Sequence, residues 1–179
     1  MACNITDGIG RPACPGETPN CYDTFWLFNR DGVASFTMGT GRTIEDIVFD
    51  AGQGYFQVVA AKGTVRAYEE RTDDDSSATD YTHAVDFKIE DLSIEANDWV
   101  NDQNGANLGA IVRTKGDKFI VFGYNDGITM KVNTMDTNAD ALGEFITLRE
   151  TNVSEKTRRM LDVSAATTLS NILAKVVGS

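Results

Sequence analysis

Residue types that could carry chemistry are sparse in this chain, and His83 is the only histidine among its 179 residues. His83 alternates with Tyr81 and Val85, which is the spacing of side chains on one face of a β-strand. No serine or cysteine has neighbours that indicate activation by a base. We therefore interpret His83 as a half-buried sheet residue rather than a general base, and we do not expect an enzyme.

The cysteines do not have the pattern of a metal site. They stand at Cys3, Cys14 and Cys21, and their spacings of eleven and seven residues differ from the close pairs of zinc sites. The odd number favours free thiols, although one disulfide among the three stays open. We expect no metal and no cofactor.

One acidic segment begins like a calcium-binding loop. Residues 136–140 read Asp-Thr-Asn-Ala-Asp, but Ala141 stands where glycine should follow, and Thr147 occupies the position of the closing glutamate. We interpret this segment as a structural turn. The glycine pairs at 8 and 10, 39 and 41, and 52 and 54 lack the strand, helix and third glycine of a phosphate-binding loop.

The amino-acid composition indicates a globular, acidic protein. Hydrophobic residues make up 41% of the chain, which predicts a globular domain, and the formal net charge is −11. Such a charge argues against binding nucleic-acid phosphates, because that affinity comes from lysine and arginine. There is no apolar run long enough to span a bilayer, and residues 1–17 lack the features of a signal peptide. We expect synthesis in a reducing cytoplasm.

Strand patterning dominates the centre of the chain. Five residues, Tyr81, His83, Val85, Phe87 and Ile89, alternate with polar neighbours over residues 80–90, as in a strand with one buried face. Residues 64–71 alternate in the same way, so the two runs predict a long β-hairpin with an acidic tip around Asp74.

Further elements follow on both sides of that hairpin. A strand is expected at residues 25–28, a short helix at 96–102 capped by Ser93 and packed through Trp99 and Val100, and a hairpin at 108–124. Asn125-Asp126-Gly127 has the sequence of a second hairpin turn, since Asp-Gly suits positive φ angles. A closing strand is expected at residues 144–149.

The two ends of the chain differ from this centre. Residues 1–23 hold all three prolines and several glycines, which predicts an extended arm. Residues 24–152 form the predicted β-sandwich domain, and residues 153–179 form a C-terminal linker or helical turn followed by an amphipathic helix. That helix either docks on its own domain or packs on a neighbouring subunit. The expected fold is therefore mainly β: an antiparallel β-sandwich or barrel with long hairpins, one flanking short helix, an N-terminal arm and a C-terminal helix.

Taken in order, these elements resemble the tail tube (major tail) proteins of long-tailed bacteriophages, those of Bacteroidetes phages in particular. The resemblance starts at Met-Ala-Cys-Asn-Ile-Thr and the Gly/Pro/Cys-rich arm, and continues through the hairpins, the short helix and Asn125-Asp126-Gly127. It ends at Met160-Leu161-Asp162 and covers about residues 1–162. The helix after Asp162 departs from the short ending of that family.

The resemblance implies a subunit of hexameric rings that stack into a tube, in the tail of a virion. Two hairpins per subunit would join across subunits into one sheet around a negatively charged lumen, and ring closure would remove the exposed strand edges. DNA would pass without specific binding, and the tape measure and other tail proteins would be partners.

This arrangement leads to expected positions for two sets of residues. The side chains expected to face the lumen are Asp86, Lys88, Glu90, Lys131 and Asn133, which leaves Val85, Phe87, Ile89, Met130 and Val132 for the core. The residues expected at contacts between subunits are Cys3, Pro12, Pro15, Asp74, Leu169 and Ile172.

Two other functions stay open. One is a different ring component of a virion tail or neck. The other is a stand-alone β-sandwich module that binds a ligand such as carbohydrate, which would require a groove of exposed aromatic side chains. The candidate aromatics, Tyr22, Trp26, Tyr55 and Tyr124, are scattered along the sequence.

Overall fold

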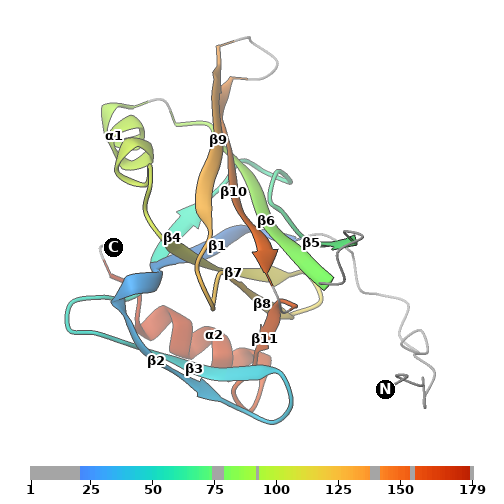
Figure 1. Ribbon diagram of the computed structural model, residues 1–179. Coiled ribbons are helices and arrows are strands. Elements are labelled where there is room, and N and C mark those ends of the chain that lie inside the picture. The colour runs from blue at the N-terminus through green and yellow to red at the C-terminus, as the bar shows by residue number, and fades with distance from the viewer. Residues whose placement is uncertain (1–20, 74–78, 92, 138–141, 154–155, 178–179) are drawn as a thin grey trace.

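The computed structural model describes residues 21–73, 79–91, 93–137, 142–153 and 156–177, which form two sheets and two helices (Figure 1). The large sheet contains, in spatial order, β2 (Val33–Met38), β3 (Thr43–Phe49), β11 (Arg158–Met160), β8 (Phe119–Phe122), β7 (Leu108–Thr114), β1 (Cys21–Asn29) and β4 (Phe56–Val59). The hairpin sheet contains β5 (Arg66–Asp73), β6 (Thr79–Ile89), β10 (Gly143–Val153) and β9 (Thr129–Asp136). The helices are α1 (Ile94–Asp102) and α2 (Ala165–Ala174). The prediction of a mainly β fold with long hairpins and a short helix is confirmed.

The centre of the large sheet is buried on both faces. Phe25 and Leu27 of β1 point into a core shared with the hairpin sheet, whereas Trp26 and Phe28 point into a second core on the other side. This is why residues 25–28 read as a continuous apolar run instead of alternating. Gly109 lies against the Phe28 ring, where a Cβ atom would overlap the ring.

Each core has one helix at its border. Ser93 caps α1 as expected: its Oγ accepts a hydrogen bond of 3.2 Å from the backbone N–H of Ala96. Val100 is buried in the first core and Trp99 packs against it. The predicted role of α1 is therefore confirmed, with the helix starting two residues earlier than expected.

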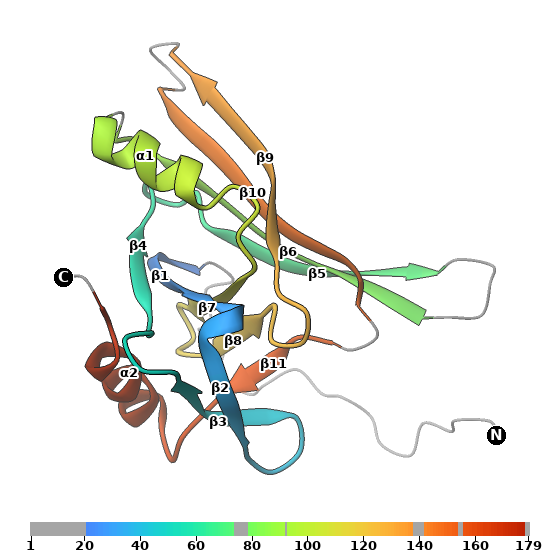
Figure 2. The same cartoon turned by 60° about the vertical axis from the view of Figure 1, so that its left-hand side comes forward.

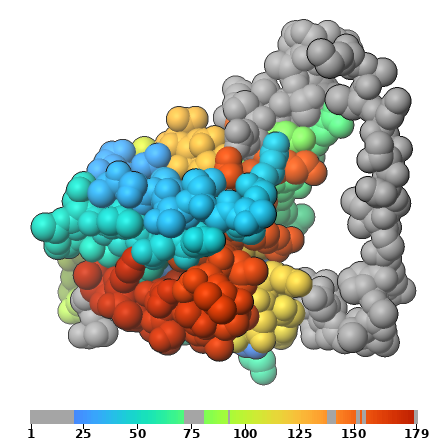
Figure 3. Space-filling view, turned by 90° about the horizontal axis from the view of Figure 1, so that it is seen from below, coloured from blue at the N-terminus to red at the C-terminus, as the bar shows by residue number. Residues whose placement is uncertain are grey.

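Helix α2 covers the second core, and Figure 3 shows it in red beside the blue and cyan segments of β2 and β3. Ile172 is 0% exposed within this core, and Leu169 packs against it. Lys175 extends the contact, since its Nζ donates to the Asp46 carboxylate at 2.6 and 2.8 Å. The helix therefore docks on its own domain. The expectation that Ile172 contacts another subunit is wrong because the chain's own core covers it, whereas a subunit contact through the partly buried Leu169 stays a prediction.

Two connections differ from the sequence expectation. Asn125-Asp126-Gly127 is a turn, with Gly127 at φ 84°, but β8 and β9 lie in different sheets, so the turn carries the chain from one sheet to the other. The linker predicted over residues 155–159 contributes β11, which lies between β3 and β8 inside the large sheet. The parallel pairing of β11 with β3 cannot be predicted from three residues, because the position of β11 depends on strands that are distant in the sequence.

Several predicted features lie outside the described residues. These are Cys3, Pro12, Pro15 and Cys14 in the N-terminal arm, Asp74 at the tip of the first hairpin, and most of the calcium-like segment 136–140. Cys21, by contrast, belongs to β1 and is a free thiol whose pKa is raised by burial.

A pair of substitutions in α2 tests whether this helix stabilises its own domain. Ile172→Ala should lower the free energy of unfolding by about 2–5 kcal/mol, because it opens a cavity in a closed core. Its neighbour Leu173 is 49% exposed, and Leu173→Ala should cost less than about 1 kcal/mol. Urea unfolding of the dilute chain measures both values, and equal losses would contradict the placement of α2.

Candidate functional site

The hairpin sheet consists of two long hairpins joined along their inner strands (Figure 2). Strand β6 pairs with β5 from Asp86↔Arg66 to Thr79↔Asp73, which confirms the first predicted hairpin. Strand β10 pairs with β6 over most of its length and with β9 on its other side. The edge strands of the sheet are therefore β5 and β9. Among the described residues, neither has a paired strand on its outer side.

Strand β9 is exposed on both of its faces. Side chains from Lys131 to Met135 all lie in solvent, with Val132 49% and Met135 59% exposed. In Figure 1 this hairpin projects beyond the body of the molecule. A long exposed edge with apolar side chains is a template for pairing with another chain, and soluble proteins ordinarily protect such edges. The β9 edge is therefore the strongest candidate for an interaction surface.

One face of the hairpin sheet packs on the large sheet, and the other, here called the outer face, is directed away from the core. Asp86 lies on the outer face and accepts a hydrogen bond of 2.8 Å from Thr147 Oγ1 on the neighbouring strand. Lys88 is buried there between the Phe145 ring, 5.4 Å from its Nζ, and Glu90, 3.5 Å away. The grouping of Asp86, Lys88 and Glu90 on one face away from the core agrees with the sequence analysis.

The side chains of β9 lie on different faces of the sheet from those that the sequence predicts. Lys131 forms a bulge, because Leu148 pairs with Met130 whereas the adjacent Thr147 pairs with Val132. An extra residue reverses the faces of everything beyond it. Val132 therefore shares the outer face with Thr147, and Asn133 shares the inner side with its partner Ile146. The placement of Val132 in the core and that of Asn133 on the lumen-facing side were wrong, whereas Val85, Phe87, Ile89 and Met130 do contribute to the core. The lumen-facing position of Lys131 stays a prediction.

The outer face has charged side chains of both signs. Among the side chains that the structure describes, the register places three basic residues there, Arg66, Lys88 and Arg149, and four acidic ones, Glu70, Asp86, Glu90 and Asp136. The guanidinium of Arg66 also stacks on the Tyr68 ring at 4.6 Å. The expected negative charge of a lumen stays a prediction.

His83 lies on the inner side of the same sheet and is 1% exposed, more deeply buried than expected. Its cross-strand neighbours are Glu69 on β5 and Glu150 on β10. The Nε2 atom is 3.7 Å from Glu69 Oε2, and Nδ1 is 4.0 Å from Glu150 Oε2. Burial, reinforced by the negative charge of Asp126, raises the pKa of Glu150 to about 7.

The sequence analysis missed this Glu69–His83–Glu150 cluster. Its only signal was the alternation of Glu69 with inward-pointing Val65 and Ala67, which puts a carboxylate on the buried side of β5. Glu150 could not be assigned in this way, because pairing it with His83 requires the register between β6 and β10.

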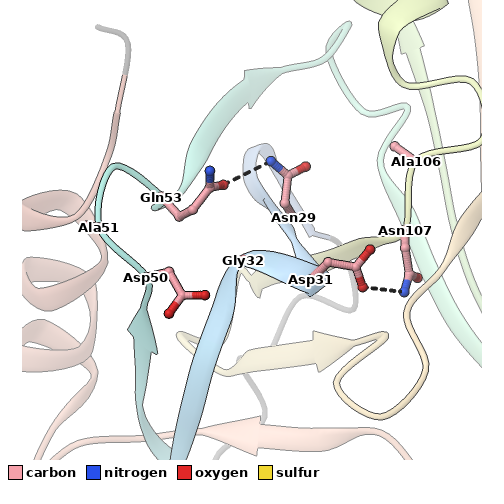
Figure 4. A pocket seen from close by; sticks show the side chains of 8 residues that line it. All are labelled: Asn29, Asp31, Gly32, Asp50, Ala51, Gln53, Ala106 and Asn107. Atoms are coloured by element: carbon pink, nitrogen blue, oxygen red, sulfur yellow. Dashed lines mark hydrogen bonds between the residues drawn. The ribbon is translucent and has the colours of Figure 1, made fainter.

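A hollow of about 450 Å³ opens between the β1–β2 turn, the β3–β4 turn and the start of β7 (Figure 4). Amides and carboxylates line it, and four of these side chains are paired with each other. Asn29 Nδ2 donates to Gln53 Oε1 at 3.1 Å, and Asn107 Nδ2 donates to Asp31 Oδ1 at 3.2 Å. No aromatic side chain lines this hollow.

The aromatic residues considered for a carbohydrate groove do not form one. Trp26, Tyr55 and Tyr124 are buried in the second core. Tyr22 is partly exposed, and the guanidinium of Arg113 covers its ring at 4.6 Å. A stacking platform for sugar rings is thus not formed by these four residues.

Metal ligands, helix length and known proteins do not indicate a chemical activity for this chain. Within the described ranges, no group of three His, Cys, Asp or Glu residues could hold a metal ion. Neither described helix has the length and apolar character needed to cross a bilayer. Comparisons with protein-family models, with curated proteins and with solved structures return no match. Function is therefore inferred from the hairpin sheet itself.

The hydrogen bond across the outer face gives a test of this geometry. Thr147→Val should lower the free energy of unfolding by about 1–2 kcal/mol, because the partly buried Asp86 carboxylate loses its donor. Thr134→Val, on the exposed β9 strand, should change it by less than about 0.5 kcal/mol. Urea unfolding of the dilute chain compares the two variants, and an unchanged value for Thr147→Val would contradict the assigned contact.

Proposed function

We propose that this protein is a structural subunit of a bacteriophage tail tube, assembling through the edges of its hairpin sheet into stacked hexameric rings. The observation that carries the proposal is the open β9 edge, exposed on both faces and bordering a sheet of two long hairpins. The resemblance over residues 1–162 supplies the identification with tail tubes and the number six.

The two open edges suit a closed ring. Strands β5 and β9 lie at opposite ends of the hairpin sheet, so β9 of one copy can pair with β5 of the next in a head-to-tail contact. Head-to-tail contacts close into rings when the rotation between copies allows it. Six copies of four strands would form a barrel of 24 strands. At about 4.8 Å per strand, its circumference exceeds roughly 115 Å, which leaves room for a DNA double helix.

The outer face would then line the lumen, because the inner face is already buried against the large sheet. Phosphate affinity requires a surplus of lysine and arginine. The outer face has three basic and four acidic side chains among those described. A lumen without a basic surplus, inside an acidic protein, would let DNA pass without holding it.

The remaining partners follow from the same proposal. The subunit would be made in the host cytoplasm and incorporated into the virion tail, where the tape measure and other tail proteins would contact it. A different ring component of the tail or neck would use the same edge pairing.

A ligand-binding module is the second candidate, favoured only by the polar hollow in Figure 4. Its amides and carboxylates are the groups that recognise hydroxyl-bearing ligands. Their mutual hydrogen bonds would have to be exchanged for bonds to the ligand, which reduces the gain in free energy.

Adjacent proline substitutions in β9 test the edge pairing. Backbone N–H groups of successive strand residues point to opposite sides, so one of Asn133 and Thr134 donates toward β10 and the other toward the open edge. Negative-stain microscopy and size-exclusion chromatography of the wild-type chain should show rings or tubes. Of Asn133→Pro and Thr134→Pro, the variant that loses the outward N–H should fold normally yet stay monomeric.

The second proline variant is the matched control, because it loses a hydrogen bond within the sheet. Its free energy of unfolding should fall measurably, by about 1 kcal/mol or more. A wild-type chain that stays monomeric at high concentration would reject the proposal. So would assembly that persists in both proline variants.

A further inference from the structure

We propose that Glu69, His83 and Glu150 form a proton-dependent latch between the two sheets, which is closed when the cluster holds an extra proton and loosens when that proton leaves. The proposal does not depend on assembly, since every group in the latch belongs to one chain.

The latch is a row of three titratable side chains across three adjacent strands. His83 on β6 is the central member, and the cross-strand partners Glu69 and Glu150 stand on either side. Carboxylate oxygens approach both ring nitrogens, at 3.7 Å and 4.0 Å. The imidazole also packs in a T-shaped arrangement with the Phe122 ring of the large sheet, with ring centroids 6.1 Å apart. The row is therefore a compact group of titratable side chains placed between the two sheets.

Two chain segments that connect the sheets lie next to the row formed by Glu69, His83 and Glu150. The chain entering β11 is held by Glu69, whose Oε2 accepts a 2.6 Å hydrogen bond from the Thr157 backbone N–H. The turn leaving β8 contains Asp126, whose charge acts on Glu150. Arg30 also fixes this turn, since its Nε donates to the Tyr124 and Asn125 carbonyls at 2.8 and 3.1 Å. A change of charge in the row therefore acts where the two sheets are joined.

The groups that surround the two glutamates differ. Lys156 Nζ lies 3.9 Å from Glu69 Oε1, and the Thr157 N–H donates to Glu69 Oε2. Lys156 also lies over the Tyr81 ring, and the Arg158 guanidinium stacks on Tyr124 at 4.6 Å. Glu150 is nearer to negative charge and is partly removed from solvent. Glu150 is thus the group that releases its proton as the solution becomes alkaline.

The sign of the effect follows from the pKa of Glu150. Its ordinary value is 4.5, and burial together with Asp126 raises it to about 7 in the folded chain. The folded chain therefore binds a proton that the unfolded chain releases between these values. The stability that this proton contributes is complete below pH 4.5 and is lost as the pH rises through about 7. Above that pH, the Glu150 carboxylate repels Asp126.

Thermal unfolding of the full chain between pH 5.5 and 8.5, at concentrations below assembly, tests the latch. Relative to Glu150→Gln, which mimics the protonated carboxyl, the wild-type Tm should fall progressively as the pH rises through about 7. Glu70→Gln is the matched control, since Glu70 is exposed on the same strand as Glu69 and points to the opposite face. It should keep the wild-type pH dependence. Identical pH dependences for wild type and Glu150→Gln would overturn the proposal.

A second variant and a local measurement separate the latch from a general loss of stability. Asp126→Asn removes one cause of the raised pKa, so the fall in Tm should move to lower pH. Hydrogen exchange followed by mass spectrometry should show lower protection at pH 8 than at pH 6 around residues 123–128 and 156–160, after correction for intrinsic rates. Glu150→Gln should retain the pH 6 protection at pH 8. Unchanged protection in the wild type would refute a latch at this joint.

Discussion

The hairpin sheet can bury only one of its faces within a single chain, and this constraint determines what remains available for other molecules. Phe87, Ile146 and Leu148 pack against the large sheet, so the opposite face and the outer edges of β5 and β9 stay outside the core. Water satisfies the backbone groups of an isolated edge, but it does not prevent another strand from pairing with them. A sheet that is both long and open at its edges is therefore a template for pairing, and in the proposed assembly a second copy of the same sheet would supply matching geometry.

The large sheet differs from the hairpin sheet in how much of its surface the chain itself covers. Its central strands are covered on one face by the hairpin sheet and on the other by α2 and the strands β2 and β3. Ile172 and Tyr55 close this second face from the C-terminal and N-terminal halves of the chain, and the Tyr55 N–H donates to the Lys175 carbonyl at 2.9 Å. Because α2 packs on its own domain, contact with neighbouring subunits in the proposed assembly would fall to the hairpin sheet.

Local patterns predicted the elements of this fold well, and the failures share one physical cause. Ser93 and the polar/apolar alternation around Phe87 act over a few residues, so the cap of α1 and the face of β6 could be inferred from sequence. Lys131 could not be recognised as a bulge, because a bulge exists only relative to the partner strand β10. The same limit applies to β11, a three-residue strand whose place depends on pairing with β3 and β8. Long-range register was the missing information in each case.

The joint between the sheets connects these observations to assembly. Head-to-tail contacts close into a ring only at a fixed rotation between neighbouring copies. In this chain, the edges that would make those contacts belong to the hairpin sheet, whereas the bulk of the subunit belongs to the large sheet. In the proposed ring, the angle between the two sheets would set the rotation between copies, and a group that stiffens the joint would narrow the range of rings that can form. Glu69, His83 and Glu150 occupy that joint. The proposed latch would therefore act on the geometry of edges that lie on the outside of the molecule.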